Sequence, residues 1–209
     1  RPITSAIPKS LIEINKKPII GHQLDNLPKN FINRVVIILG YKGNQIKDYV
    51  NSLDLNYPVI FLKNDKYAYT NCAYSFMRAR DYMSGSLVLI NCDLLFKKDN
   101  VLKLCITEKK NVINVRKIGN SKTDLQDVII EKSKITSWAL NIPGANAEVM
   151  GPIKLCPPDA KKIIRHFDSL SELAKEQLHC FSLFSKLIKI IDYNTVFVDD
   201  TSWMEIDTE

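Results

Sequence analysis

The chain has 209 residues, of which 45% are hydrophobic and 25% charged, and this composition excludes a globally disordered chain. A folded chain of this length buries about 65–75% of its unfolded surface, which is enough for one domain over residues 1–209. The net charge of +6 comes from lysines spread along the chain, without the aromatic-interleaved basic stripe typical of nucleic-acid binding, so we expect no nucleic-acid partner.

Apolar runs and cysteines restrict the compartment. No apolar run approaches the ~18 residues that a membrane span needs, and no signal peptide is visible, so we expect a cytoplasmic protein. The five cysteines are odd in number and lack C-x-x-C spacing, and we interpret them as reduced thiols that pack as small buried hydrophobes.

The first half of the chain alternates apolar runs with helical periodicity. Strands are predicted at residues 34–40, 58–62, 87–90 and 112–115, and helices at 43–53, 72–83 and 101–106. This order indicates crossover connections, and hence an α/β fold with a central mixed, mostly parallel sheet flanked by helices.

The pattern changes after residue 120. Short β-like pieces at 128–130, 135–138 and 149–155 suggest a hairpin or an antiparallel addition to the sheet. Helices at 159–167 and 171–191, a strand at 195–198 and a final loop at 199–209 complete the prediction. Ser169 and Glu172 form a possible capping box at the start of the second helix.

Asp93 follows the apolar run LVLI at 87–90. An acidic residue just past the carboxyl end of a buried strand faces the crevice where open α/β sheets bind ligands. A carboxylate there can hold Mg²⁺ against triphosphate oxygens, whereas the structural alternative is a cap for the next turn. In the last segment, WMEIDT at 203–208, alternation places Glu205 and Asp207 on one face if the stretch is extended.

Four segments together resemble the sugar nucleotidyltransferase superfamily, and its phosphocholine cytidylyltransferase-like subgroup in particular. They are RPITSAIPKSL at 1–11 with NKKPII at 15–20, NCD at 91–93, NDKYAYTNCAYS at 64–75, and WMEIDT at 203–208. The resemblance runs from Pro2 to Glu209 and is weakest between residues 110 and 145. It implies a Rossmann-like nucleotidyltransferase (GT-A-like) fold, whose first strand and glycine-rich loop we expect to precede residue 1.

The resemblance also implies roles for individual residues. Lys9 would balance charge on the α-phosphate and the leaving pyrophosphate, and Asp93 and Asp207 would hold Mg²⁺ as the cofactor. Pro8 and Asn71 would join Lys9 and Asp93 around the nucleotide. The residues implied at the acceptor are Tyr67, Ser75, Glu148, Trp203 and Glu205, with Glu148 supplied by AEVMGPIKL at 147–155.

Aromatic residues offer a further possibility. Trp203, Trp138, Tyr67 and Tyr74 would suit a cage for a quaternary ammonium, although packing is the commoner role of such side chains.

Some positions depart from the subgroup pattern. Cys72 replaces an Asn, Cys92 replaces a Gly, and Asp127 and Ala139-Leu140 stand near the places where relatives carry lysines for the acceptor phosphate.

The predicted reaction joins CTP to phosphocholine or a related phosphorylated alcohol, amine or phosphonate, giving a CDP-linked product and pyrophosphate. A sugar-1-phosphate nucleotidyltransferase and a degenerate nucleotide-binding domain remain alternatives. A glycosyltransferase would want a D-x-D motif after the strand, which Asn91-Cys92-Asp93 is not. A homodimer or an additional domain in the full-length protein is compatible with all of these.

Overall fold

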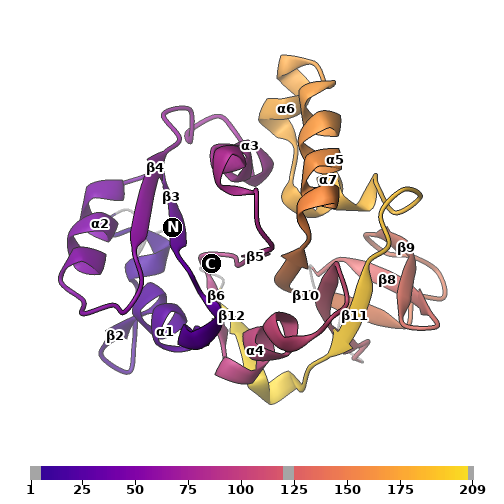
Figure 1. The fold of residues 1–209 in the computed structure, drawn as a ribbon, viewed down its shortest axis with the longest axis horizontal. Coiled ribbons are helices and arrows are strands. Elements are labelled where there is room, and N and C mark those ends of the chain that lie inside the picture. Colours follow the sequence, from indigo (N-terminus) through magenta and orange to yellow (C-terminus); the bar gives the residue numbers. More distant parts are fainter. Residues whose placement is uncertain (1–5, 120–124, 207–209) are drawn as a thin grey trace.

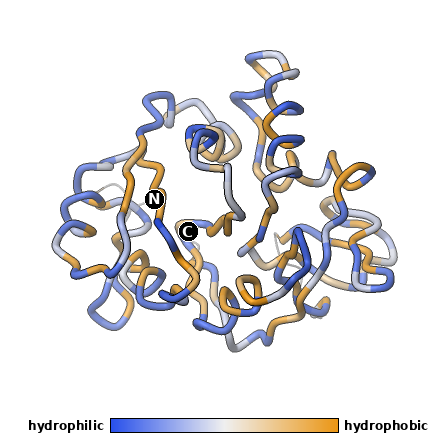
Figure 2. The backbone as a smooth tube through the Cα atoms, viewed as in Figure 1, coloured by the Kyte–Doolittle hydropathy of each residue, from blue (hydrophilic) through white to orange (hydrophobic). Residues whose placement is uncertain are grey.

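The computed structural model describes residues 6–119 and 125–206. The first half contains a small hairpin, β1 (Glu13–Ile14) and β2 (Lys17–Pro18), followed by α1 (Ile19–Asp25), β3 (Val35–Leu39), α2 (Gly43–Asn51) and β4 (Val59–Lys63). Strands β3 and β4 pair in parallel through the α2 crossover, as the sequence predicts. Figure 2 shows both strands as largely hydrophobic beside the hydrophilic outer side of α2.

The middle of the chain links the two sides of the molecule. It consists of α3 (Cys72–Met77), β5 (Leu87–Leu89), β6 (Leu94–Phe96), α4 (Lys98–Ile106) and β7 (Val112–Lys117). In Figure 1, α3, β5 and β6 lie between the β3–β4 pair on one side and the later strands and helices on the other.

The second half supplies the remaining elements. They are β8 (Asp127–Glu131), β9 (Lys134–Ala139), β10 (Ala147–Leu155), α5 (Pro157–Asp168), α6 (Glu172–Gln177), α7 (Cys180–Ser185), β11 (Asn194–Phe197) and β12 (Trp203–Glu205). The predicted hairpin is confirmed as β8–β9, whose turn residues Lys132 and Ser133 both have positive φ, 48° and 66°. Two such residues in succession make the turn whose twist matches that of paired strands.

The expectation of a mostly parallel sheet is wrong. The main sheet has six strands in the order β5-β10-β7-β11-β9-β8, and β10 also pairs with β8, which closes a ring. Only β7 and β11 run parallel within this sheet. The long, buried β10 enters between β5 and β7 antiparallel to both, and it thereby separates strands that the strand–helix alternation had suggested as parallel neighbours.

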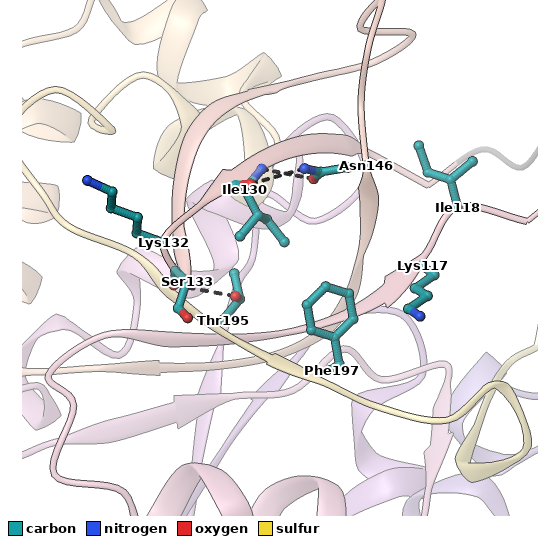
Figure 3. A pocket seen from close by; sticks show the side chains of 8 residues that line it. All are labelled: Lys117, Ile118, Ile130, Lys132, Ser133, Asn146, Thr195 and Phe197. Atoms are coloured by element: carbon teal, nitrogen blue, oxygen red, sulfur yellow. Dashed lines mark hydrogen bonds between the residues drawn. The ribbon is translucent and has the colours of Figure 1, made fainter.

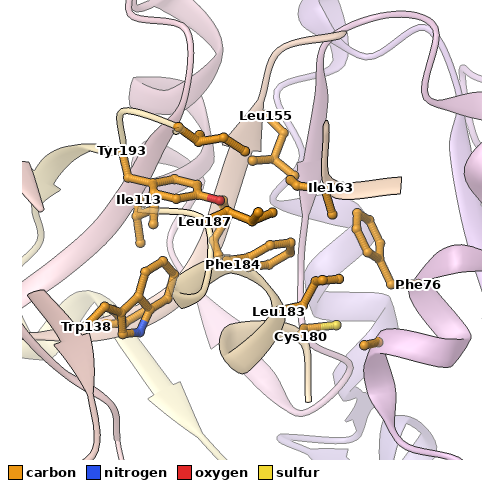
Figure 4. Close-up of a cluster of buried hydrophobic side chains, with 14 of the residues drawn as sticks. Phe76, Ile113, Trp138, Leu155, Ile163, Cys180, Leu183, Phe184, Leu187 and Tyr193 are labelled. Atoms are coloured by element: carbon orange, nitrogen blue, oxygen red, sulfur yellow. The ribbon is translucent and has the colours of Figure 1, made fainter. Parts of the chain in front are cut away.

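The hydrophobic core forms two clusters. One lies among α1, α2, β3, β6 and α4, and includes Leu24, Leu39, Val50 and Val101. The other fills the space between the main sheet and helices α3, α5 and α7, where Figure 4 shows Phe76, Ile113, Trp138, Leu155, Phe184 and Tyr193 converging.

Several helix ends differ from the sequence prediction, and α3 and the predicted helix 171–191 differ most. Helix α3 ends at Met77 and is followed by a 3₁₀ turn, and the predicted helix 171–191 breaks at Leu178 and His179, whose backbones are extended. The cap of α6 is Ser171, whose hydroxyl accepts from the amide of Ala174, whereas the Ser169 hydroxyl donates to the His166 carbonyl. The final segment is a strand rather than a loop at residues 203–205, because it pairs with β6.

Candidate functional site

Lys9 and Asp93 meet although 84 residues separate them in the chain. Pro8 precedes a 3₁₀ turn at Lys9–Leu11, which its carbonyl closes by accepting from the Leu11 amide at 2.8 Å. From this turn Lys9 Nζ reaches Asp93 Oδ2 at 3.0 Å, and the two side chains keep 25% and 21% of their exposure. A cation and a carboxylate thus share one partly solvated position at the end of β5.

Helix α1 holds the loop that carries Asp93. The side-chain nitrogen Nε2 of Gln23 donates to the backbone carbonyls of Asn91 and Leu94, each at 2.7 Å. One turn further along, Asn26 donates to the carbonyl of Phe96 at 2.9 Å. The backbone on both sides of Asp93 is therefore fixed by a single side chain, Gln23, which the sequence analysis missed.

The C-terminal segment returns to the same loop. Strand β12 lies beside β6 (Figure 1), with Glu205 opposite Leu94 in the register. The amide of Ile206 then donates to the Asp93 carbonyl at 2.9 Å. Glu205 is half-buried within this pairing. Asp207, the second predicted metal ligand, lies outside the described residues.

The loop between β4 and α3 is organised around Asn64, which is buried. Its amide nitrogen donates to the hydroxyls of Thr70 at 2.9 Å and Ser75 at 3.0 Å. Tyr67 is 43% exposed and packs on the backbone of Gly40, where a Cβ would come within 2.8 Å of the tyrosine Cβ. Asn64 thus connects the two predicted acceptor residues, since its carbonyl accepts from the Tyr67 amide and its side chain donates to Ser75 in α3.

Asn71 stands at the junction of this loop with the helices. Its side-chain oxygen accepts from the Cys72 amide at 2.8 Å, and its nitrogen lies 2.8 Å from Nε2 of His179. Its backbone amide donates to the Glu176 carbonyl at 2.7 Å. The contact of Asn71 with a nucleotide stays a prediction.

Glu148 and Trp203 are joined by a residue that the sequence analysis did not single out, Arg116. The guanidinium Nε lies 2.7 Å from Glu148 Oε2, and the carboxylate side chain is only 6% exposed. The same guanidinium lies over the Trp203 ring at 5.3 Å and within 3.8 Å of Asp200. Arg116 could have been found from the sequence, because it is a charged residue that directly follows the apolar run of β7.

Two members of the suggested aromatic cage, Trp138 and Tyr74, pack in the core instead. Trp138 is buried in the second core cluster, where its ring meets Tyr193 edge-on at 5.6 Å. Trp203 packs against the first core cluster instead. Tyr74 packs edge-on against Phe167, so Trp138 and Tyr74 have core partners of their own.

The departures from the subgroup pattern have different consequences. Asp127 accepts a hydrogen bond from the Ile142 amide at 3.0 Å and so fixes the turn after β9, while Leu140 is exposed. Contrary to the expectation of buried thiols, Cys72 and Cys92 are exposed, whereas Cys156 and Cys180 are buried.

The prediction that Asp93 binds Mg²⁺ can be compared with the side chains that surround it. Within residues 6–119 and 125–206, no three His, Cys, Asp or Glu side chains come together as a metal site. Magnesium bound to nucleoside triphosphates needs only one or two carboxylates, because phosphate oxygens and water supply the other ligands. The half-buried carboxylate of Asp93 beside Lys9 fits that requirement.

A pocket of about 540 Å³ lies away from these residues, on the face formed by the ends of β7, β8 and β11 (Figure 3). Asn146 uses its side chain to bond both the amide and the carbonyl of Ile130, and the Thr195 hydroxyl donates to the Ser133 carbonyl. These polar groups therefore hold the strands together. None of the predicted site residues lines this pocket.

Comparisons with known proteins give the chain a family. A family model described as "Domain of unknown function (DUF6564)" matches residues 9–123. The chain is 36% identical over 97 residues to the choline-phosphate cytidylyltransferase of Streptococcus pneumoniae, covering 46% of this chain and 41% of that protein. It is 30% identical over 144 residues to the CTP:phosphoglutamine cytidylyltransferase of Campylobacter jejuni, covering 66% and 50%. The chain thus spans about half the length of these curated relatives, or less.

The fold agrees with this relationship. The structure of the inositol-1-phosphate CTP transferase from T. maritima superposes with a TM-score of 0.81 at 22% identity, covering 100% of this chain and 84% of that one. The α/β nucleotidyltransferase fold predicted from the sequence is confirmed. No helix in the described part of the chain has the length and apolar character of a membrane span. The chain belongs to the family of the domain of unknown function DUF6564, within the sugar nucleotidyltransferase superfamily.

Proposed function

We propose that this chain forms the catalytic part of a cytidylyltransferase, which transfers CMP from CTP to a small phosphorylated acceptor and releases pyrophosphate. The observation that carries this proposal is the pairing of Lys9 with Asp93 at the carboxyl end of β5. An ammonium beside a carboxylate, at a strand end held by Gln23, suits a triphosphate with its metal.

In this reaction a phosphate oxygen of the acceptor attacks the α-phosphorus of CTP, and the bond from that phosphorus to the bridging oxygen of pyrophosphate breaks. Lys9 would release Asp93 when nucleotide binds and place its positive charge against the phosphate oxygens, where negative charge builds up. Asp93 and Asp207 would hold Mg²⁺, which when bound neutralises triphosphate charge. No enzyme nucleophile is required, because the acceptor reacts directly.

The acceptor would lie between the 64–75 loop and the C-terminal segment. Tyr67 and Ser75 are held on the first by Asn64, and Trp203 is held on the second by Arg116. Since Glu148 is buried against Arg116, we assign it the role of holding that arginine under the Trp203 ring. Glu148 would then act on the acceptor indirectly, through Arg116 and Trp203. The sequence relatives act on choline phosphate and phosphoglutamine, which places phosphorylated amines and amides first among the candidates.

The test is pyrophosphate release by the full-length protein with Mg²⁺. Each of the four nucleoside triphosphates is combined with phosphocholine, aminoethylphosphonate, glycerol phosphate and hexose 1-phosphates. Asp93→Asn and Asp207→Asn are assayed beside Asp192→Asn, which changes an exposed carboxylate that pairs with the exposed Lys134, outside the proposed site.

Release with CTP and one acceptor, abolished by the changes at Asp93 and Asp207 but retained in Asp192→Asn, is the expected result. Release with a hexose 1-phosphate alone would assign the chain to sugar activation instead. Nucleotide binding without any turnover would indicate a non-catalytic binding domain, and absence of nucleotide binding would overturn the proposal.

A further inference from the structure

Two cysteines far apart in the sequence are stacked at the junction of α3 with the α6–α7 link. The segment 71–73 runs beside the segment 176–180, with the Asn71 amide bonded to the Glu176 carbonyl and the Ala73 amide to the Leu178 carbonyl. Continuing this pairing, the backbone amide of Cys180 donates to Cys72 Sγ at 3.1 Å. The backbone therefore holds the Cys72 sulfur directly against Cys180.

The two thiols differ in their access to solvent. Cys72 is exposed. Cys180 is only 7% exposed and lies in the second core cluster, close to Leu183 in Figure 4. A reagent in solution therefore meets Cys72 first, and the Cys180 thiol is available only to a group already attached at Cys72.

The surroundings of Cys72 favour its thiolate. Hydrogen bonding with the Cys180 side chain lowers the pKa of Cys72 to about 6, against the opposing effect of burial, and the Cys180 amide and the charge of His179 lower it further. Burial raises the pKa of Cys92, in the loop after β5, to about 11, and the charge of Cys72 adds slightly to this effect. The same contacts raise the pKa of Cys180 well above its usual value. At neutral pH the pair is thus an exposed thiolate over a buried thiol.

We propose that Cys72 is a site of covalent thiol modification and that Cys180 is its resolving partner. With a hydroperoxide, the Cys72 thiolate attacks the O–O bond, which gives a sulfenic acid at Cys72 and releases hydroxide from H₂O₂. The Cys180 sulfur then attacks the oxidised sulfur, a disulfide forms, and water carries away the hydroxyl oxygen with the thiol proton. Two electrons pass from the thiol pair to the peroxide.

The modification has a consequence for activity that rests on the proposed function. Cys72 follows Asn71, the predicted nucleotide residue, whose side chain bonds the Cys72 amide and lies against His179. A disulfide would fix residues 71–73 to the α6–α7 link and restrict Asn71. The oxidised enzyme is therefore expected to be slower in pyrophosphate release, and dithiothreitol to restore the rate.

The reactivity is tested without reference to catalysis. The reduced full-length protein is treated with limiting iodoacetamide at pH 6, and the alkylated cysteines are quantified by peptide mass spectrometry. At pH 6 a thiol of pKa about 6 is about half ionised, whereas an ordinary thiol is almost entirely protonated. After the correction for the weaker nucleophilicity of the low-pKa thiolate, the expected excess in rate over an ordinary thiol is about tenfold. Because the pKa of Cys92, the other exposed thiol of the described chain, is raised above its usual value, Cys72 should be alkylated at least about tenfold faster than Cys92. Equal rates at the two sites would overturn the proposal.

The role of Cys180 is tested with stoichiometric hydrogen peroxide. The expected product is a Cys72–Cys180 linked peptide, and in Cys180→Ser a Cys72 sulfenic acid that dimedone traps. A disulfide from Cys72 to any other cysteine would remove Cys180 from the proposal. Since Cys180→Ser places a hydroxyl in the core, Cys180→Ala serves as a second variant, and the wild-type mapping decides even if both variants fail to fold. These readouts stay valid if no cytidylyltransferase activity is found, so failure of one proposal is distinguishable from failure of the other.

Discussion

Arg116 and Glu148 face each other across strands β7 and β10, with the guanidinium Nε 2.7 Å from the carboxylate Oε2. Both side chains are largely buried, and the same guanidinium lies over the ring of Trp203. The arginine thus lies between an anion and an aromatic ring. It also fixes β12 against the main sheet.

Replacing Arg116 with Ala should destabilise the protein strongly, because it removes the guanidinium that pairs with the buried Glu148 carboxylate. The expected loss in the free energy of unfolding is about 3–5 kcal/mol, measured by urea denaturation. Replacing both residues together, as Arg116→Met with Glu148→Leu, should cost much less than Arg116→Ala. Equal losses in the single and double variants would show that the ion pair is not what the arginine contributes.

Replacing Gln23 with Ala should slow pyrophosphate release more than its effect on stability explains. The variant loses two hydrogen bonds, to Asn91 and Leu94, and each bond of this kind contributes about 1 kcal/mol. The loop with Asp93 is then free to shift. The matched control is Asn26→Ala, which removes a similar bond from the same helix to Phe96, farther from Asp93. If Asn26→Ala lowered kcat as much as Gln23→Ala, Gln23 would have no particular role in placing Asp93.

Replacing Lys9 with Met should lower kcat/KM for CTP by about 10²–10³-fold, the usual effect of removing one group that stabilises transition-state charge. Stability should change little, since the Lys9–Asp93 pair is partly solvated. Lys63→Met is the control, because that lysine is exposed and pairs with the exposed Asp65. Steady-state kinetics with CTP varied would decide, and comparable losses in the two variants would exclude a specific role for Lys9.

Stability at alkaline pH should depend on Tyr193. Burial raises the pKa of this phenol well above its usual value, with the charge of Asp159 adding to the effect. Above pH ~10 the unfolded chain loses the phenolic proton while the folded chain keeps it, so the free energy of unfolding falls by up to about 1.4 kcal/mol per pH unit. The Tyr193 hydroxyl has no hydrogen-bond partner among the described residues. Tyr193→Phe should therefore be tolerated at pH 7 and should flatten the alkaline fall, as urea denaturation between pH 8 and pH 11 would reveal.

The sequence pattern predicted helices and strands best where neighbouring segments of the chain bury each other's apolar side chains. The run VVIIL at Val35–Leu39, the following helix and the strand at Val59–Lys63 all form as expected, because β-branched runs and helical periodicity act within short segments. Helix 171–191 was wrong because Leu178 and His179 adopt extended backbone where the chain pairs with residues 71–73. That contact comes from more than 100 residues away in the chain.

The sequence by itself determined the superfamily and the nucleotidyltransferase fold, and it singled out Lys9 and Asp93, which the structure brings together, because ordered motifs retain their spacing whatever surrounds them. The tertiary structure decided the rest: the antiparallel entry of β10, the hold of Gln23 on the Asp93 loop, the Arg116–Glu148 pair and the stacking of Cys72 on Cys180. Each of these depends on which distant backbone supplies a hydrogen bond or a counter-charge. Such partners are chosen by the packing of the whole core, and no local pattern records them.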